Sequence, residues 1–390
     1  MITLGSGLAP IPERLLLAHA RGGVLFLAGA GISKHSGLPD FRDLVLGVYA
    51  RLDPPVYSVL SRVPATAHNQ WEVHLSGVTH RQAAEVRRFV SGDYDVVLGM
   101  LERRMDGRSH DKSRVRQAIS AELHTSAAKP APIHRALMRL SDRGGATAIV
   151  TTNFDLLLED VGKATRSPVQ TYALGGIPKP SHREDFSGVF HIHGAFDRDR
   201  TRASDLIVTD HDFGEYYLRR RVVPDFIYDA ARLYNLVLVG YSANDPPMRY
   251  LLNAVAADVA RFEDLKERFA FVAEDSDPIV LEDWKGRGIT PIPYEPANDY
   301  STLRDTLERW AILSAINGKR SRIDAEVKRI VRTSRTAASE SDRDTFDHLI
   351  RRSDSTERVR LSALASKRSA DFGWLEAITA IASENDRGRC

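Results

Sequence analysis

The sequence predicts an α/β fold: a Rossmann-like, mainly parallel sheet with a helical insertion and a C-terminal helical segment. Three observations support this prediction. Short apolar runs recur through the first 300 residues, helical patterns lie between most of them, and residues 43–130 and 301–390 are mostly helical in pattern. Strands that are apolar on both faces and alternate with helices are typical of parallel sheets covered by helices on both sides.

The predicted strands are short runs of apolar residues. The first covers residues 24–31 and follows a short helix over residues 11–21, which ends at Gly22-Gly23. The remaining predicted strands, of which the last is the weakest, are 146–153, 188–194, 205–210, 235–242, 268–274 and 289–296.

Two helical regions suggest how the chain is organised. We interpret residues 1–300 as one α/β domain, within which residues 43–130 form a helical insertion that could cover the mouth of a site. Residues 301–390 hold 18 Lys and Arg against 14 Asp and Glu. We interpret this slightly basic helical segment as a region for assembly or partner docking.

Composition restricts the class of protein. The formal net charge of +2 over 390 residues gives no overall sign of nucleic-acid binding, although a local patch stays open. The one cysteine, Cys390, forms no disulfide framework and no cysteine zinc site within a chain, as expected in a reducing compartment. No apolar run reaches the length of a membrane span, and several charged residues precede the apolar run at 24–32. We therefore expect a cytoplasmic protein with no membrane contact and no bound metal.

Small and polar residues follow four of the predicted strands. Ligands of open α/β sheets bind outside the carboxyl ends of the strands, so these four ends together predict one shared pocket. The four segments are Gly29-Ala30-Gly31-Ile32-Ser33, Thr151-Thr152-Asn153-Phe154-Asp155, His191-Ile192-His193-Gly194 and Gly240-Tyr241-Ser242-Ala243-Asn244-Asp245-Pro246.

The glycines after the first strand suit a phosphate-binding turn. Gly29 and Gly31 would let the backbone approach a pyrophosphate, with the N–H groups of the next helix start pointing at it. The dinucleotide fingerprint requires a third glycine where this chain has Lys34, so the run is not the dehydrogenase pattern. A purely structural turn stays open.

The polar side chains at the next strand ends have two interpretations. Asn153 and Asp155 either cap the following helix or hydrogen-bond a ribose or an amide. His193 is either a buried structural histidine or a base, because a neutral imidazole with a pKa near 6.5 suits proton transfer from a sugar hydroxyl or water. His191 lies inside the strand, and we expect it to be structural.

These motifs resemble those of the sirtuins. GAGISKHSGLPDFR resembles their GAG-x-S-x-x-SG-I-PDFR motif, TTNFD their TQNID, His193-Gly194 their catalytic His-Gly pair, and GYSANDP the GYS-x-x-DP form of the prokaryotic sirtuin-like group. The four motifs occur in the family's order, and the resemblance covers roughly residues 10–300. It implies that residues 1–300 form a catalytic domain that binds NAD.

Departures from the family refine this expectation. The protein deacylases of the family carry a four-cysteine zinc module between the His-Gly pair and the last motif, whereas no cysteine lies between His193 and Gly240. The zinc-less branch includes bacterial anti-phage proteins that hydrolyse NAD, some with a HerA-type ATPase. The resemblance therefore implies a zinc-independent NAD glycohydrolase, an NADase of anti-phage defence that forms a homo-oligomer or partners a HerA-type ATPase.

The resemblance also implies roles for individual residues. Asn153 would position the ribose or the attacking water, His193 would accept a proton, and Asp155 would line the nicotinamide pocket with Ala30 and Ile32. The family's asparagine that contacts the adenosine end has no evident counterpart here. The implied NAD-binding residues are Gly29, Ala30, Gly31, Ser33, Asp40, Phe41, Arg42, Gly240, Ser242, Asn244 and Asp245.

Three other functions stay open at this point. An NAD-dependent protein deacylase would consume an acyl-lysine peptide together with NAD. A non-catalytic module would bind NAD or ADP-ribose without turnover. An interaction subunit would bind nucleic acid through the basic tail at 301–390. In the enzyme, the helical insertion is a candidate gate for the pocket.

Overall fold

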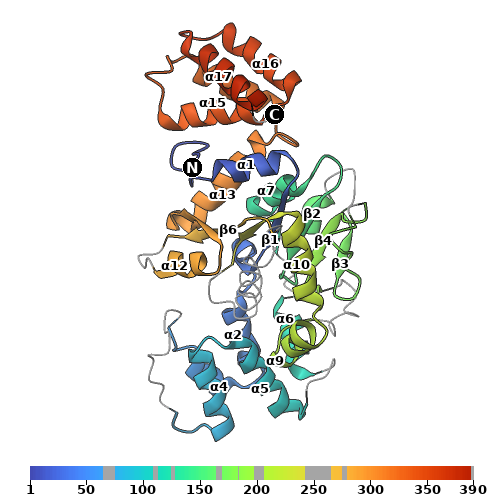
Figure 1. The fold of residues 1–390 in the computed structure, drawn as a ribbon. Coiled ribbons are helices and arrows are strands. Elements are labelled where there is room, and N and C mark those ends of the chain that lie inside the picture. The colour runs from blue at the N-terminus through green and yellow to red at the C-terminus, as the bar shows by residue number, and fades with distance from the viewer. Residues whose placement is uncertain are drawn as a thin grey trace.

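A computed structural model describes residues 1–64, 75–108, 113–123, 128–163, 169–182, 184–196, 206–241, 265–274 and 279–387. Within these residues, seven strands form one sheet in the order β3-β4-β2-β1-β5-β6-β7, and every neighbouring pair is parallel (Figure 1). The predicted Rossmann-like parallel sheet is therefore confirmed. The strands are β1 (Val24–Ala28), β2 (Ala148–Thr151), β3 (Thr171–Ala173), β4 (Gly188–His191), β5 (Asn235–Val239), β6 (Arg268–Ala273) and β7 (Thr290–Tyr294).

Helices cover both faces of the sheet, and the side chains of β1 show this division. Val24, Phe26 and Ala28 lie in the buried cluster beneath α1, α7 and α13, whereas Leu25 and Leu27 lie in the cluster beneath α10 and α12. Successive side chains of a strand point to opposite faces, so this alternation gives the sheet two buried faces. These helices are α1 (Glu13–Ala20), α7 (Pro132–Ser141), α10 (Val222–Leu233), α12 (Ile279–Gly286) and α13 (Ala297–Leu313).

The strand order places the candidate site. Strands β2, β3 and β4 lie on one side of β1, and the later strands β5, β6 and β7 lie on the other. The order in which strands are added to the sheet therefore reverses between β1 and β5. Ligands of open α/β sheets bind at such a switch point, outside the carboxyl ends of the strands. The four strands predicted to share a pocket, β4, β2, β1 and β5, are consecutive neighbours, so their carboxyl ends form one continuous edge.

Two strand predictions differ from the structure. Residues 206–210 form no strand: Leu206, Ile207 and Val208 are buried, but their segment joins no strand ladder. The Val208 N–H donates to the Asp212 carboxylate at 3.1 Å instead, so the burial of the run misled the prediction. Strand β3 was missed because it has three residues, all at least partly exposed.

The insertion is helical, as predicted. Its helices pack around their own buried apolar cluster, which includes Val48, Phe89 and Leu101. Figure 1 shows this layer beyond one edge of the sheet, and the C-terminal helices at the opposite end of the molecule. The insertion helices are α2 (Phe41–Leu52), α3 (Pro54–Leu60), α4 (His80–Val90), α5 (Tyr94–Asp106) and α6 (Arg114–Leu123).

The C-terminal segment is helical and continuous with the main core. Trp310 of α13 packs edge-on against His19 and Phe26, at ring-centroid distances of 5.0 Å and 5.5 Å. The same buried cluster extends to Trp374 in the last helix. The remaining helices are α14 (Arg320–Ile330), α15 (Glu340–Arg352), α16 (Ser355–Ser366) and α17 (Gly373–Arg387).

Over the described ranges, no helix is both long enough and apolar enough to cross a membrane.

Candidate functional site

Three glycines let the turns after β1 and β5 pack against each other. The Gly31 N–H donates to the Gly240 carbonyl at 2.9 Å. A Cβ added at Gly29 would lie 2.6 Å from the Gly240 oxygen, and one added at Gly31 would lie 2.9 Å from the Gly240 Cα. Gly240 itself has a φ of 75°, in the left-handed region that favours glycine. The close approach that these glycines permit is thus between two segments of the protein.

Several backbone amides of this turn already have partners within the protein. The N–H groups of Gly29, Ile32 and Ser33 donate to carbonyls of Val239, Gly29 and Ala30 at 2.9, 3.2 and 3.0 Å. Binding of a pyrophosphate by the remaining amides of this turn stays a prediction. The turn forms two short 3-10 segments, η1 (Ala30–Ile32) and η2 (Lys34–Ser36), instead of a helix start.

Ser33 joins the ends of β1 and β2. Its buried hydroxyl donates to Asp155 Oδ2 at 2.9 Å and accepts a hydrogen bond from Asn153 Nδ2 at 3.0 Å. The His134 Nε2 lies 3.4 Å from the same hydroxyl. The structure therefore brings three residues of the predicted site together and adds His134, which the sequence analysis missed.

The protonation of His134 follows from its contacts. The Ala131 N–H donates to Nδ1 at 3.1 Å, so Nδ1 is an acceptor and the ring hydrogen is on Nε2, facing Ser33. Burial lowers the pKa of His134 to about 4, so the ring is neutral at pH 7. No local spacing links His134 to Ser33, which explains why the motifs did not reveal it.

Asn153 is held on three sides. Its N–H donates to the Thr151 hydroxyl at 3.0 Å, and its carbonyl accepts a hydrogen bond from His191 Nδ1 at 2.8 Å. Its amide nitrogen binds Ser33, as described above. Its side-chain oxygen, Oδ1, is buried and has no hydrogen-bond partner among the described residues. Buried polar atoms are rarely unpaired, so a missing partner requires an explanation.

Asp155 connects two elements. Its Oδ1 accepts a hydrogen bond from the Leu157 N–H at 3.1 Å, at the start of α8 (Leu157–Gly162), and its Oδ2 accepts one from Ser33. Burial raises the pKa of this carboxyl group. The helix-capping interpretation agrees with these contacts, while a role in nicotinamide binding stays a prediction.

His191 forms a buried ion pair with Glu159. Its Nδ1 donates to the Asn153 carbonyl, so its Nε2, at 2.7 Å from Glu159 Oε1, requires the second ring proton. Burial alone would lower the pKa of His191, but the carboxylate outweighs it and raises that pKa. The structural role expected for His191 agrees with this geometry. Sequence analysis missed Glu159, two residues into α8.

His193 has a different environment. Its ring packs edge-on between Phe213 and Tyr217, and its Nε2 lies 2.6 Å from the Tyr217 hydroxyl. Burial lowers its pKa to about 3, so the ring is neutral and a weaker base than the ordinary value suggested. Tyr217 lies in the π-helical turn η4 (Gly214–Arg219), and π turns frequently occur at functional sites.

Asp40, Phe41 and Arg42, which the resemblance implies bind NAD, form the start of helix α2 of the insertion. Asp40 caps the start of α2. The Phe41 ring packs edge-on against Tyr94 at 6.1 Å, and Arg42 Nη2 donates to the Val63 carbonyl at 2.6 Å. These contacts anchor the insertion, and a role of the three residues in NAD binding stays a prediction.

The end of β5 is described only in part. The Tyr241 hydroxyl donates to the Ala28 carbonyl and accepts a hydrogen bond from Thr152, each at 3.2 Å. Ser242, Asn244 and Asp245 lie outside the described residues. In the described part of the chain, no cluster of three or more His, Cys, Asp or Glu side chains could hold a metal ion.

Comparison with known proteins identifies one family segment. Residues 147–292 match the SIR2-like domain, and this segment contains Asn153, Asp155, His193 and Gly240. An uncharacterized protein, y4cA, from Sinorhizobium fredii is 37% identical over 312 residues, which cover 77% of this chain and 24% of that protein. The NAD-dependent protein deacylase 1 of Pseudomonas aeruginosa is 31% identical over 147 residues, or 38% of this chain and 41% of that protein.

The chain thus spans less than half the length of these two relatives. Two solved structures also match, each 16% identical to this chain. A Sir2 homologue in complex with NAD has a TM-score of 0.38, with 79% of this chain and 95% of that chain covered. A structure from a study of the mechanism and regulation of Sir2 enzymes has a TM-score of 0.37, with 76% and 96% covered.

Proposed function

We propose that this chain binds NAD at the carboxyl ends of β4, β2, β1 and β5 and hydrolyses its nicotinamide–ribose bond. The observation that carries the proposal is Asn153 Oδ1, a buried acceptor without a partner among the described residues. Ribose hydroxyls and the carboxamide of nicotinamide are hydrogen-bond donors of the kind that this oxygen lacks. The SIR2-like match over residues 147–292 supports the same ligand.

The proposed reaction needs little proton transfer at the leaving group. Nicotinamide is cationic in NAD and leaves as a neutral base when the bond to the ribose C1′ breaks. Positive charge then develops on the ribose, where an amide oxygen such as Asn153 Oδ1 stabilises it. Water attacks C1′ and loses a proton, which His193 receives and passes to solvent. The products are nicotinamide, ADP-ribose and a proton.

The experiment that tests this proposal measures nicotinamide release from NAD. Asn153→Ala and His193→Ala should lose at least about 10²-fold of the activity, the lower range for a general base. Matched controls are Asn235→Ala, at the start of β5 on the opposite edge of the sheet, and the exposed His35→Ala. Circular dichroism checks that each variant is folded. Wild-type turnover by both site variants would contradict the assignment of Asn153 and His193 to the catalytic site.

A deacylase is the second candidate, because a 31% identical relative carries that name. The four-cysteine zinc module of such enzymes cannot form in a chain with one cysteine. Consumption of an acetyl-lysine peptide coupled to NAD would favour the deacylase. Binding of NAD without nicotinamide release, in the presence of candidate partners, would favour a regulatory binding module.

We further propose that the enzyme acts as the NAD-depleting effector of an anti-phage system, assembled with copies of itself or with a HerA-type ATPase. We place the docking surface on the C-terminal helices, where Val359 and Phe372 are 71% and 78% exposed. Because Trp310 belongs to the main core, deleting residues 301–390 would disturb the fold. A better test compares the particle mass of the wild type with that of Phe372→Asp, with and without the ATPase.

A further inference from the structure

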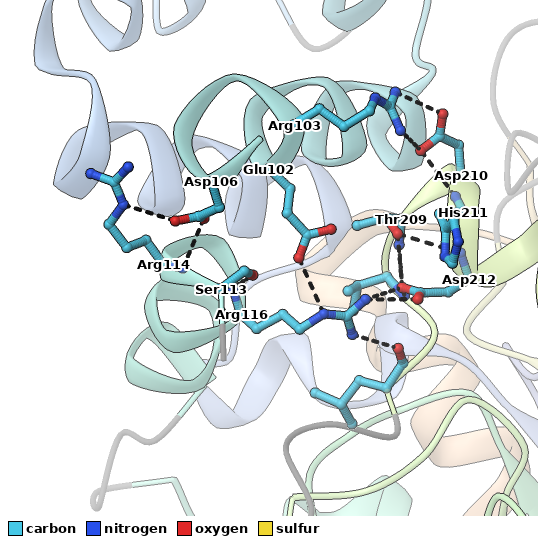
Figure 2. Close-up of polar contacts among 12 residues, drawn as sticks. Glu102, Arg103, Asp106, Ser113, Arg114, Arg116, Thr209, Asp210, His211 and Asp212 are labelled. Atoms are coloured by element: carbon cyan, nitrogen blue, oxygen red, sulfur yellow. Dashed lines mark hydrogen bonds and ion pairs between the residues drawn. The ribbon is translucent and has the colours of Figure 1, made fainter. Parts of the chain in front are cut away.

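A buried ion pair joins the insertion to the segment that carries Tyr217 (Figure 2). Arg116 of α6 donates from Nη2 to both carboxylate oxygens of Asp212, at 2.7 Å and 2.8 Å. Its Nε donates to Glu102 of α5 at 3.2 Å, and its Nη1 donates to the Leu206 carbonyl at 3.0 Å. Arg116, Asp212 and Glu102 are 3%, 7% and 0% exposed. Such a pair is geometrically specific, because both guanidinium and carboxylate have fixed shapes.

Asp212 in turn organises its own segment. Its Oδ2 accepts hydrogen bonds from the N–H groups of Val208 and Thr209 and from the Thr209 hydroxyl, at 3.1, 3.0 and 2.9 Å. These bonds form the start of α9 (Asp210–Phe213), which continues without a break into the π turn η4. Tyr217 lies in that turn, five residues after Asp212. The position of its hydroxyl therefore depends on the Arg116–Asp212 pair.

We propose that Tyr217 is a positioning residue for His193, and that the Arg116–Asp212 pair between the insertion and α9 holds Tyr217 in place. The proposal deepens the NAD hydrolase assignment and rests on it for the catalytic consequence. The His193 ring lies between the aromatic rings of Phe213 and Tyr217, which set its position but not its hydrogen-bonding state.

The Tyr217 hydroxyl, 2.6 Å from Nε2, fixes the orientation of that ring, because a phenol can pair with this nitrogen as donor or as acceptor. Without it, only aromatic packing would hold the ring, and the direction of its nitrogens would be less well defined. The insertion is thus part of the catalytic unit, since it supplies the arginine on which this arrangement depends.

The kinetic test uses Tyr217→Phe, Asp212→Asn and the double variant. Tyr217→Phe should lower kcat for nicotinamide release by about 10–10²-fold, with KM for NAD unchanged, because small errors in position cost this much. Asp212→Asn should have a similar effect. The double variant should be no slower than the slower single variant, because both substitutions act through His193.

The matched control is Arg103→Ala. Arg103 of α5 and Asp210 also join the insertion to α9, through hydrogen bonds of 2.9 Å and 3.0 Å, but their side chains are 44% and 32% exposed. An exposed pair contributes little, so Arg103→Ala should keep the wild-type kcat. If Asp212→Asn does not fold, Tyr217→Phe alone tests the positioning role of Tyr217. This substitution removes one oxygen from a ring that otherwise keeps its packing.

A second readout does not require turnover. In protein with ¹⁵N-labelled histidine, the Nε2 signal of His193, assigned with His193→Gln, should shift in Tyr217→Phe and Asp212→Asn, because each variant removes or displaces its hydrogen-bond partner. If no variant, including the wild type, releases nicotinamide but these shifts change as expected, the positioning role stands and the NAD hydrolase proposal fails. If the wild type is active, and both variants keep its kcat and its His193 shifts, the positioning proposal is overturned.

Discussion

The side-chain oxygen of Asn153 is a buried acceptor without a partner among the described residues, and it lies at the candidate site. Ser33, Thr151 and His191 hold its amide nitrogen, its N–H and its carbonyl, so the direction of the side chain is set before any ligand arrives. Leaving one buried acceptor unpaired costs about 1–3 kcal/mol. When a ligand donates a hydrogen bond to this oxygen, the penalty of the unpaired acceptor is removed, and this gain favours binding.

Gly31 is required because a side chain at this position would collide with the backbone of Gly240. Gly31→Ala would place a Cβ 2.9 Å from both the Cα and the oxygen of Gly240, where only backbone can give way. Overpacking of this kind costs about 1–3 kcal/mol, so we expect a loss of that size in the free energy of unfolding, measured with a chemical denaturant.

The matched control is Gly286→Ala in α12, where a Cβ would meet nothing within 4 Å. It should leave stability unchanged or raise it, because alanine favours helices. Equal stability of Gly31→Ala and the wild type would contradict the interlocked turns.

At the scale of elements, helix α8 and strand β4 are joined through the ion pair of Glu159 and His191. Glu159 also accepts a hydrogen bond from the Thr171 hydroxyl of β3 at 3.1 Å, so one carboxylate connects three elements. The pair orients the segment around Asn153, because His191 holds the Asn153 carbonyl.

We expect Glu159→Gln to destabilise the protein by about 3–5 kcal/mol, since it leaves His191 charged without its buried partner. Denaturant unfolding monitored by circular dichroism measures this loss. The double variant Glu159→Leu/His191→Leu should cost less than the sum of the two single variants, because it leaves neither charge buried alone. Additive losses would show that the two residues do not interact.

The elements also show what the sequence could predict. Apolar runs and the polar residues after them predicted four strand ends at one site, and β4, β2, β1 and β5 are indeed adjacent. The carboxyl ends of parallel strands lie at one edge of a sheet, so the motifs could predict that edge, whereas the order of the strands came from the structure. The run at 205–210 was misassigned because buried apolar residues do not distinguish a strand from an extended segment held by the Asp212 carboxylate.

Sequence analysis missed three residues of the candidate site for the same reason. His134, Glu159 and Tyr217 act through partners 101, 32 and 24 residues away, on other elements. No periodicity or spacing encodes such contacts. Polar residues within a few positions of a motif, such as Glu159 after Asp155, were the only available signal, and helix surfaces are rich in such residues.

For the whole molecule, buried histidines make stability depend on pH. Burial lowers four histidine pKa values from 6.5, to about 4 or about 3. The unfolded chain therefore binds more protons than the folded one between pH 6.5 and pH 4, and the free energy of unfolding should fall as the pH falls through this range. Each fully shifted histidine contributes about 1.4 kcal/mol per pH unit. The four residues are His19, His134, His193 and His348.

Four groups oppose this trend. The pKa values of His191, Asp155, Asp95 and Asp344 are raised, so the folded protein takes up their protons at a higher pH than the unfolded chain does. We expect a net decrease in stability from pH 7 to pH 5, measured by denaturant unfolding at each pH. His348→Gln, far from the candidate site, should flatten this dependence. If His348→Gln shows the same change of stability with pH as the wild type, or if the wild type is equally stable at pH 7 and pH 5, the buried histidines are not the cause of the pH dependence.

The two proposed tasks lie at opposite ends of the molecule. The insertion lies at the carboxyl edge of the sheet, where we propose that its Arg116–Asp212 pair holds Tyr217 beside His193. The C-terminal helices lie at the opposite end, away from the candidate site (Figure 1). A partner on the C-terminal helices would therefore act through the shared core, whereas a ligand on the insertion would act directly on the site.

The most direct test of the central claim is a crystal structure of His193→Ala bound to NAD. We predict that the nicotinamide ribose or carboxamide lies at the carboxyl ends of β2 and β1, with a donor within about 3.2 Å of Asn153 Oδ1. NAD bound elsewhere on the protein, or bound there with Asn153 Oδ1 still unpaired, would contradict the account.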